Sequence, residues 1–79
     1  MRGSDAVKLR ILSLAKQKGI SINKLCTAGG LTTSTLNSML NDESDYCSVR
    51  TLIKICQGLG ITLYEFFNDE IFNDIDFEY

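Results

Sequence analysis

The pattern that most constrains the fold occurs four times, and in it a helix-capping residue lies between two apolar residues. Ser and Thr are favoured N-cap residues because their hydroxyl oxygen accepts a hydrogen bond from a free amide of the first helical turn. An apolar residue just before the cap and another four positions after it form a hydrophobic staple. The four sets are Ser21 with Ile20 and Leu25, Thr32 with Leu31 and Leu36, Ser48 with Cys47 and Leu52, and Thr62 with Ile61 and Phe66. Glu65 adds a capping box to the last one. The pattern therefore predicts where four helices begin.

The predicted helices fill most of the chain and leave short connections. The first is expected from about Asp5 to Lys18, because apolar residues recur there at helical spacing and Gly19 follows. The others are expected at about 22–29, 33–40, 49–59 and 63–68. The chain shows no alternating strand pattern, no Pro and no repeat. It is therefore predicted to be an all-α, compact five-helix domain over residues 5–68, followed by a tail over residues 69–79.

Length and composition exclude several classes of protein. A chain of 79 residues with 44% hydrophobic content is expected to form one domain. No apolar run approaches the roughly eighteen residues of a membrane span, and no charged-then-apolar leader is recognised, so no membrane partner is expected. Residues 1–4, Met-Arg-Gly-Ser, are typical of an expression vector and are left out of the predicted fold.

The cysteines argue against a disulfide framework and against a metal site. The chain has 3 Cys and 0 His, and it contains no C-x-x-C motif, so neither a zinc site nor another metal centre is expected. Reduced cysteines fit the cytosol, and a cytoplasmic protein is predicted. Cys26 and Cys56 fall on apolar helix faces and are expected in the core. Cys47 falls in a polar loop, where it can crosslink two chains in air.

Residues 21–40 carry the strongest functional signal. Two short predicted helices are joined by a turn that contains Gly30, which is the sequence form of a DNA-binding helix-turn-helix. The second helix would then enter the major groove, whose base edges are read by side chains with both donors and acceptors. The candidate base-reading residues are Thr33, Ser34, Asn37 and Ser38. Without the surrounding pattern, such residues would be taken for an ordinary solvated helix face.

Phosphate contacts are expected at the beginnings of the same two helices. Helix N-termini present free amides and favour anions, and cations and hydroxyls add affinity. The candidates are Ser21, Asn23, Lys24 and Thr32, with Arg10, Lys16 and Lys18 as weaker ones.

Charge divides the chain into two halves, which fits a basic working surface and an acidic tail. Residues 1–41 hold six basic residues and one acid, a net +5, whereas residues 42–79 hold two basic residues and nine acids, a net −7.

The tail also carries several apolar residues, and Ile71, Phe72, Ile75 and Tyr79 can form one helical stripe. Leu9 and Leu12 lie opposite the apolar face of the first helix. The tail is therefore expected to pack on Leu9 and Leu12, in its own chain or across a dimer, although a frayed terminus is the plainer alternative.

These residues resemble the Cro/CI-type helix-turn-helix family, also called the xenobiotic-response-element family or lambda-repressor-like domains. The resemblance covers about residues 7–67 and implies five helices, with the third in the major groove of an operator. It also implies that Asn41 begins a loop that lies along the DNA backbone. The residues that carry it are Ile11, Leu14, Gly19, Ile20, Ser21, Leu25, Cys26, Gly30, Leu31, Thr32, Ser34, Thr35, Leu36 and residues 51–56, 59–63 and 65–67.

The chain departs from the family pattern at positions that affect DNA affinity. Ile22 replaces a Gln that often binds phosphate, and Ala15 and Leu40 replace an Arg–Glu ion pair. An apolar pair can replace such an ion pair without loss of stability. The loop after the third helix carries Asp42, Glu43 and Asp45, which would repel phosphates, and the third helix has no Arg or Lys for guanine. Monomer binding is therefore expected to be modest and salt-sensitive.

Two functions of different classes follow from these observations. The first is a small transcriptional regulator that binds double-stranded DNA as a homodimer, at half-sites roughly 34 Å apart. The alternative is a protein-interaction module on the same scaffold that uses the acidic tail, since fold alone does not fix function. An enzyme is not expected, because the chain has no His, no carboxylate pair in an apolar context and no Gly-rich phosphate loop. No cofactor and no small-molecule ligand are expected either.

Overall fold

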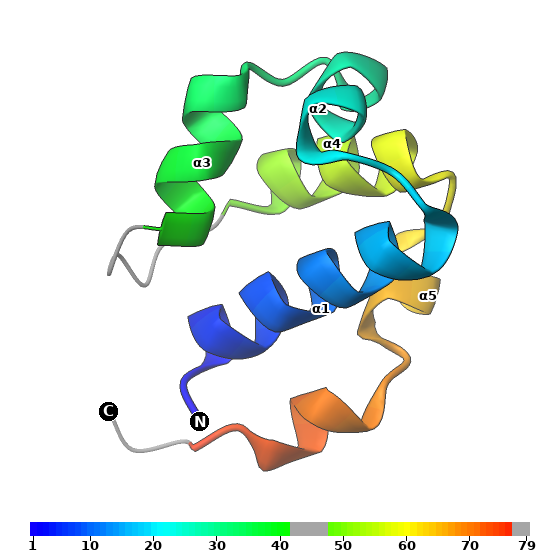
Figure 1. Ribbon diagram of the computed structural model, residues 1–79. Coiled ribbons are helices and arrows are strands. Elements are labelled where there is room, and N and C mark those ends of the chain that lie inside the picture. Colours follow the sequence, from blue (N-terminus) through cyan, green and yellow to red (C-terminus); the bar gives the residue numbers. More distant parts are fainter. Residues whose placement is uncertain (42–47, 77–79) are drawn as a thin grey trace.

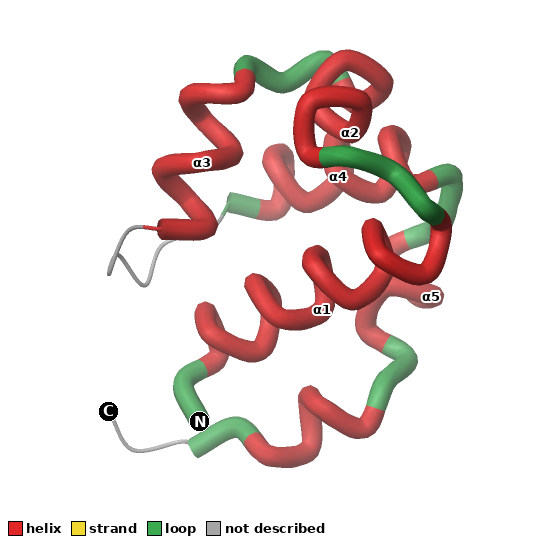
Figure 2. Tube along the Cα trace, viewed as in Figure 1, coloured by secondary structure: helices red, strands yellow, loops and turns green. Residues whose placement is uncertain are grey.

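The computed structural model describes residues 1–41 and 48–76, and every regular element in this part of the chain is helical. The helices are α1 (Gly3–Lys18), α2 (Ile22–Gly29), α3 (Thr33–Asn41), α4 (Val49–Leu59) and α5 (Leu63–Phe67), followed by the 3-10 helix η1 (Glu70–Asp74). In Figure 1, α1 crosses the middle of the molecule, with α2, α3 and α4 on one side and η1 on the other. Figure 2 shows how short the α1–α2, α2–α3 and α4–α5 connections are. The prediction of an all-α, five-helix fold is confirmed.

The capping residues lie at the predicted helix starts. The Ser21 Oγ accepts a hydrogen bond from the Lys24 amide at 3.2 Å, and the Ser48 Oγ accepts one from the Thr51 amide at 3.2 Å. Thr62 and Glu65 form the predicted capping box. Gly19, Gly30 and Gly60 end α1, α2 and α4 with φ between 64° and 74°, the left-handed conformation that glycine adopts without steric cost.

The staples supply much of the core. Leu25, Leu36 and Phe66 are each 0% exposed, and Ile20, Leu31 and Ile61 pack against the same apolar cluster. The fourth predicted staple involves Cys47, which lies outside the described residues. The core is completed by residues from α1, α2 and α4, namely Ile11, Leu14, Cys26, Leu52, Ile55, Cys56 and Leu59.

A close backbone approach joins α2 to α4. Gly29 is buried as the last residue of α2, and a Cβ added to it would collide with the carbonyl oxygen of Lys54. A Cβ on Gly58 would come within 2.7 Å of the Leu25 side chain and of its carbonyl oxygen. The pair of glycines at 29–30 therefore has two roles: Gly30 makes the turn, and Gly29 lets the two helices touch.

Both ends of the chain differ from the sequence prediction. Helix α1 begins at Gly3, so Gly3 and Ser4, which were left out of the predicted fold, form its first turn. Residues 70–74 form a 3-10 helix rather than one turn of a longer α-helix. The Phe72 amide donates to the Asp69 carbonyl oxygen three positions back, which is the 3-10 pattern, and the Asp69 carboxylate accepts from the Ile71 amide. The predicted stripe of Ile71, Phe72, Ile75 and Tyr79 is therefore not formed as an α-helix over 70–76, and Tyr79 lies outside the described residues.

The C-terminal segment packs beside α1 of the same chain, as Figure 1 shows. Phe72 joins the core, with its ring centroid 6.0 Å from that of Phe66 and 5.0 Å from that of Phe67. Ile71 and Ile75 are half-buried. Leu9 and Leu12 keep 47% and 46% of their surface exposed, so the segment leaves much of these two side chains uncovered.

Candidate nucleic-acid interface

Helix α3 is attached to the domain along one narrow face. Its only buried residue is Leu36, whereas Met39 and Leu40 are partly buried and pack against the core. The candidate base-reading residues Thr33, Ser34, Asn37 and Ser38 are all exposed on the remaining surface, and we call them the α3 polar face. Helical spacing explains the exposure of residues 34, 37 and 38, which lie one or two positions off the 36–40 row, and Thr33 is the first residue of the helix. The structure thus brings the four predicted residues together on one accessible surface.

The beginnings of α2 and α3 are in contact through polar side chains. The Thr33 hydroxyl lies 3.5 Å from the Asn23 Oδ1, a long hydrogen bond in which Thr33 is the donor. The Thr27 hydroxyl donates to the Asn23 carbonyl oxygen at 3.1 Å. A candidate phosphate contact on α2 and a candidate base contact on α3 are therefore neighbours, as one duplex would require.

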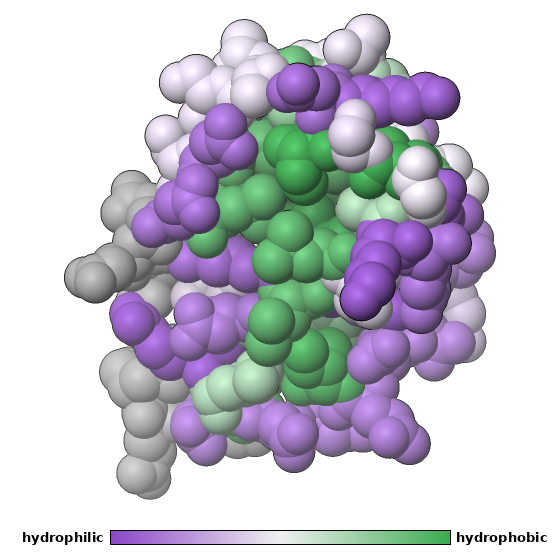
Figure 3. All heavy atoms as spheres, in the orientation of Figure 1, coloured by the Kyte–Doolittle hydropathy of each residue, from purple (hydrophilic) through white to green (hydrophobic). Residues whose placement is uncertain are grey.

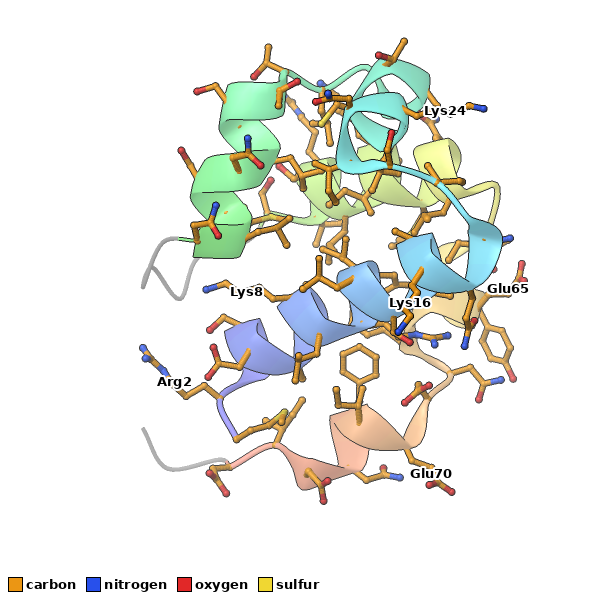
Figure 4. All side chains as sticks on the ribbon, viewed as in Figure 1. Arg2, Lys8, Lys16, Lys24, Glu65 and Glu70 are labelled. Carbon is orange, nitrogen blue, oxygen red and sulfur yellow. The ribbon has the colours of Figure 1, made fainter. Side chains whose placement is uncertain are left out.

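The candidate phosphate contacts on these helices are exposed. Ser21 is the N-cap of α2 and Lys24 lies in its first turn, and Figure 4 shows the Lys24 side chain directed away from the helix bundle. Because the Ser21 oxygen accepts the Lys24 amide, its hydroxyl proton remains available for a phosphate. Asn41 is also exposed, but it is the last residue of α3 rather than the first of the loop. The acidic residues Asp42, Glu43 and Asp45 lie outside the described residues.

Thr35 is a further polar residue at the start of α3, and the sequence reasoning did not single it out for the site. The Thr32 oxygen accepts the Thr35 amide at 3.1 Å, and the two hydroxyl oxygens are 2.7 Å apart. The spacing T-x-x-T could have signalled this pair, since it repeats the capping-box spacing with a hydroxyl in place of Glu. No acidic residue lies in the first turn of α2 or of α3, whereas α5 has Glu65 there.

Arg10 is not available to bind phosphate, contrary to the sequence prediction. Its side chain is 10% exposed, and its guanidinium donates to three oxygens near the end of α5. These hydrogen bonds are Nε to the Phe66 carbonyl at 2.8 Å, Nη2 to the Glu65 carbonyl at 2.9 Å and Nη1 to the Asp69 carboxylate at 3.0 Å. Arg10 therefore caps the C-terminus of α5, as cations do at helix C-termini. Lys16 and Lys18 are exposed in the last turn of α1, and Figure 4 shows Lys16 far along α1 from α3.

The departures from the family pattern lie in apolar surroundings. Ala15 is 4% exposed, and Ile22 and Leu40 pack against the core. Each position contributes to packing where the family pattern often has a polar side chain. These residues support the fold and offer nothing to a phosphate.

The two described cysteines are free and buried. Burial raises the pKa of the Cys56 thiol above its ordinary value of 9.0, because the thiolate loses hydration in the core. Among residues 1–41 and 48–76, no group of three His, Cys, Asp or Glu side chains could hold a metal ion. Over the same residues, no helix is long and apolar enough to cross a membrane.

Comparison with known proteins identifies the family. None of the curated proteins compared with the chain matches it. The crystal structure of the prophage Lp1 protein 11 is similar, with a TM-score of 0.81 and 30% sequence identity over 95% of this chain and 100% of that chain. The family model of the Cro/C1-type HTH DNA-binding domain matches residues 10–70. That match includes α2, α3, α4 and α5 in full and most of α1, and the chain therefore belongs to the Cro/C1-type helix-turn-helix DNA-binding family.

Proposed function

We propose that this protein is a small transcriptional regulator that binds double-stranded DNA sequence-specifically, with α3 in the major groove and two copies on one operator. The observation that carries the proposal is the α3 polar face, four exposed side chains on a helix whose opposite side is fixed by the fully buried Leu36. A major groove about 12 Å wide accepts one α-helix. Helix α3 projects at the edge of the domain in Figure 1, where a duplex can reach it.

The chemistry of this face suits direct readout without charge. The Asn37 side-chain amide can accept a hydrogen bond from the adenine N6 amino group and donate one to N7. The hydroxyl groups of Thr33, Ser34 and Ser38 can form hydrogen bonds with several base edges, and the Thr33 methyl can contact a thymine methyl. Since α3 has no Arg or Lys, electrostatic affinity must come from the backbone amides at the start of α2 and from Lys24. One copy therefore binds weakly, and a second copy on a half-site roughly 34 Å away supplies the affinity.

Selection from a random DNA library at two salt concentrations tests this function. We expect a specific sequence to be enriched, and we expect Asn37→Ala to lose preference at one base pair, a change of about 1–3 kcal/mol. Gln17→Ala is the matched control, because it removes an exposed amide from the last turns of α1. No enrichment and no salt dependence would contradict the regulator and favour a protein-interaction module that uses the acidic tail.

A further inference from the structure

One face of α1 carries two exposed leucines, although the opposite side of the helix is buried in the core. Asp5, Leu9, Leu12 and Lys16 follow each other at spacings of four, three and four, which places them on one side of the helix. We call these four residues the α1 outer stripe. Leu9 is 47% exposed and Leu12 is 46% exposed, whereas Ile11 and Leu14 on the opposite side are buried. Figure 3 shows apolar side chains gathered in a band that crosses α1, with hydrophilic side chains on both sides.

The order of charges along the stripe makes it complementary to itself. An acid stands at one end, a base at the other and two leucines between them. If two such helices pack antiparallel, so that residue i faces residue 21 − i, Leu9 faces Leu12 of the second copy and Asp5 faces its Lys16. A parallel pairing would instead place acid on acid and base on base. The stripe therefore favours a second copy of the same chain, with its α1 antiparallel to the first.

Both charged residues are available for a partner. Among the described residues, neither Asp5 nor Lys16 takes part in an ion pair, whereas Arg10 is paired with Asp69. An acid near the start of a helix and a base near its end also complement the helix dipole, so their placement alone would be ordinary. The two leucines between them are not explained by the dipole, because that face is turned away from the core.

We infer that the α1 outer stripe is a self-association surface, on which a second copy of this chain packs with its α1 antiparallel. The inference rests on the homodimer in the proposed function. A two-fold dimer uses the same patch on both copies, which this stripe satisfies. Val49 and Ile53 on α4 are exposed too, but Gln57, one turn further on, supplies no opposite charge. The charged residues determine the orientation of the two copies more than their affinity. Each copy contributes only two half-exposed leucines, so the apolar area buried in the dimer is small and the dimer is weak.

Sedimentation velocity without DNA tests the surface, from about 10 μM to about 1 mM protein, a range chosen for the weak end of dimer affinities. We expect a monomer–dimer equilibrium within this range. Leu12→Glu should weaken it by at least about tenfold, because the new carboxylate would be buried against a leucine. Gln17→Glu adds the same charge away from the stripe and should leave the equilibrium unchanged. A wild-type monomer throughout the range, or a dimer unaffected by Leu12→Glu, overturns the inference.

A charge exchange tests the antiparallel orientation. Asp5→Lys and Lys16→Asp should each weaken the dimer, and the double variant should restore it because each copy again meets an opposite charge. Lys18→Asp makes the same change in the last turn, off the stripe, and should have no effect. Circular dichroism melting confirms that each variant is folded. A double variant as weak as the single ones overturns the pairing. Because no DNA is present, failure here is distinct from failure of the library selection.

Discussion

The elements that lie on the two sides of α1 are joined by two different kinds of contact. On one side, α2 and α4 meet through their backbones, at Gly29 and Gly58, with no charged group at the contact. On the other side, the guanidinium of Arg10 attaches the end of α5 to α1, and a cluster of three Phe rings joins α5 to the C-terminal segment. The first contact tolerates no added atom, and the second depends on charge and hydrogen-bond geometry.

This difference suits the two sides to different tasks. A backbone-to-backbone contact fixes α2 on α4. Helix α3 follows α2 after a connection of three residues, 30–32, and the Thr32 side chain at its end accepts the Thr35 amide. A DNA-reading surface benefits from such preorganisation, because less freedom is lost on binding. The α5 side carries acids, among them Glu65, Asp69 and Glu70, and would repel phosphates. The structure thus separates a neutral polar surface from an acidic one.

Gly29→Ala is expected to cause the largest loss of stability. The added methyl would meet the carbonyl oxygen of Lys54, and α2 cannot relieve the clash without moving away from α4. We expect the free energy of unfolding to fall by at least about 3 kcal/mol, at the upper end of overpacking effects. Urea denaturation followed by circular dichroism measures it.

Gly19→Ala is the matched control for this variant. Nothing lies within 4 Å of the position of its Cβ, so only the left-handed backbone, with φ of 64°, opposes the change. The expected loss is about 1–2 kcal/mol. If Gly29→Ala costs no more than Gly19→Ala, the close contact does not hold α2 on α4.

Arg10→Ala should be the next most damaging change, because it removes three hydrogen bonds from a guanidinium that is nearly buried. We expect a loss of about 2–3 kcal/mol, as for buried hydrogen bonds to charged groups. Lys18→Ala, which removes an exposed cation from the same helix, should change stability by less than about 0.5 kcal/mol. Equal effects of the two variants in urea denaturation would show that Arg10 does not attach α5 to α1.

The smallest expected effect concerns the Cys56 thiol. Because burial raises its pKa above the ordinary 9.0, the folded state holds this proton more tightly than the unfolded state. Its contribution to stability is therefore complete below about pH 9 and is lost as the pH rises through the folded pKa. The free energy of unfolding cannot fall by more than about 1.4 kcal/mol per pH unit through the titration of one group. Cys56→Ala should remove this part of the alkaline decline in thermal melts, and an unchanged decline would contradict the assignment.

The local features of the fold were predictable from the sequence because they depend on near neighbours. The caps at Ser21, Thr32, Ser48 and Thr62 bond to amides three residues away, and their spacing predicted where the helices begin. The bounds of α2 and α4 agree with the prediction. Exposure of the α3 polar face also followed from helical spacing, whereas its contact with DNA stays a prediction.

Two of the features that were missed depend on residues far apart in the chain. Arg10 lies 56 positions before the Phe66 carbonyl, and only the fold shows that it is not a surface cation. Gly29 and Gly58 sit within or at the end of helices, where a glycine gives no periodic signal of a close approach. The 3-10 turn at 70–74 is a local feature instead, and the apolar spacing of the tail did not reveal the carboxylate–amide bond at its start.

Amide chemical-shift mapping with a selected duplex tests the central claim most directly, since it reports on both sides of α1 at once. The account predicts that the large changes fall on residues 21–24 and 32–38, and that residues 63–74 change little. Changes confined to α5 and η1, with α3 unaffected, would contradict DNA reading by α3 and would place the working surface on the acidic side of the molecule.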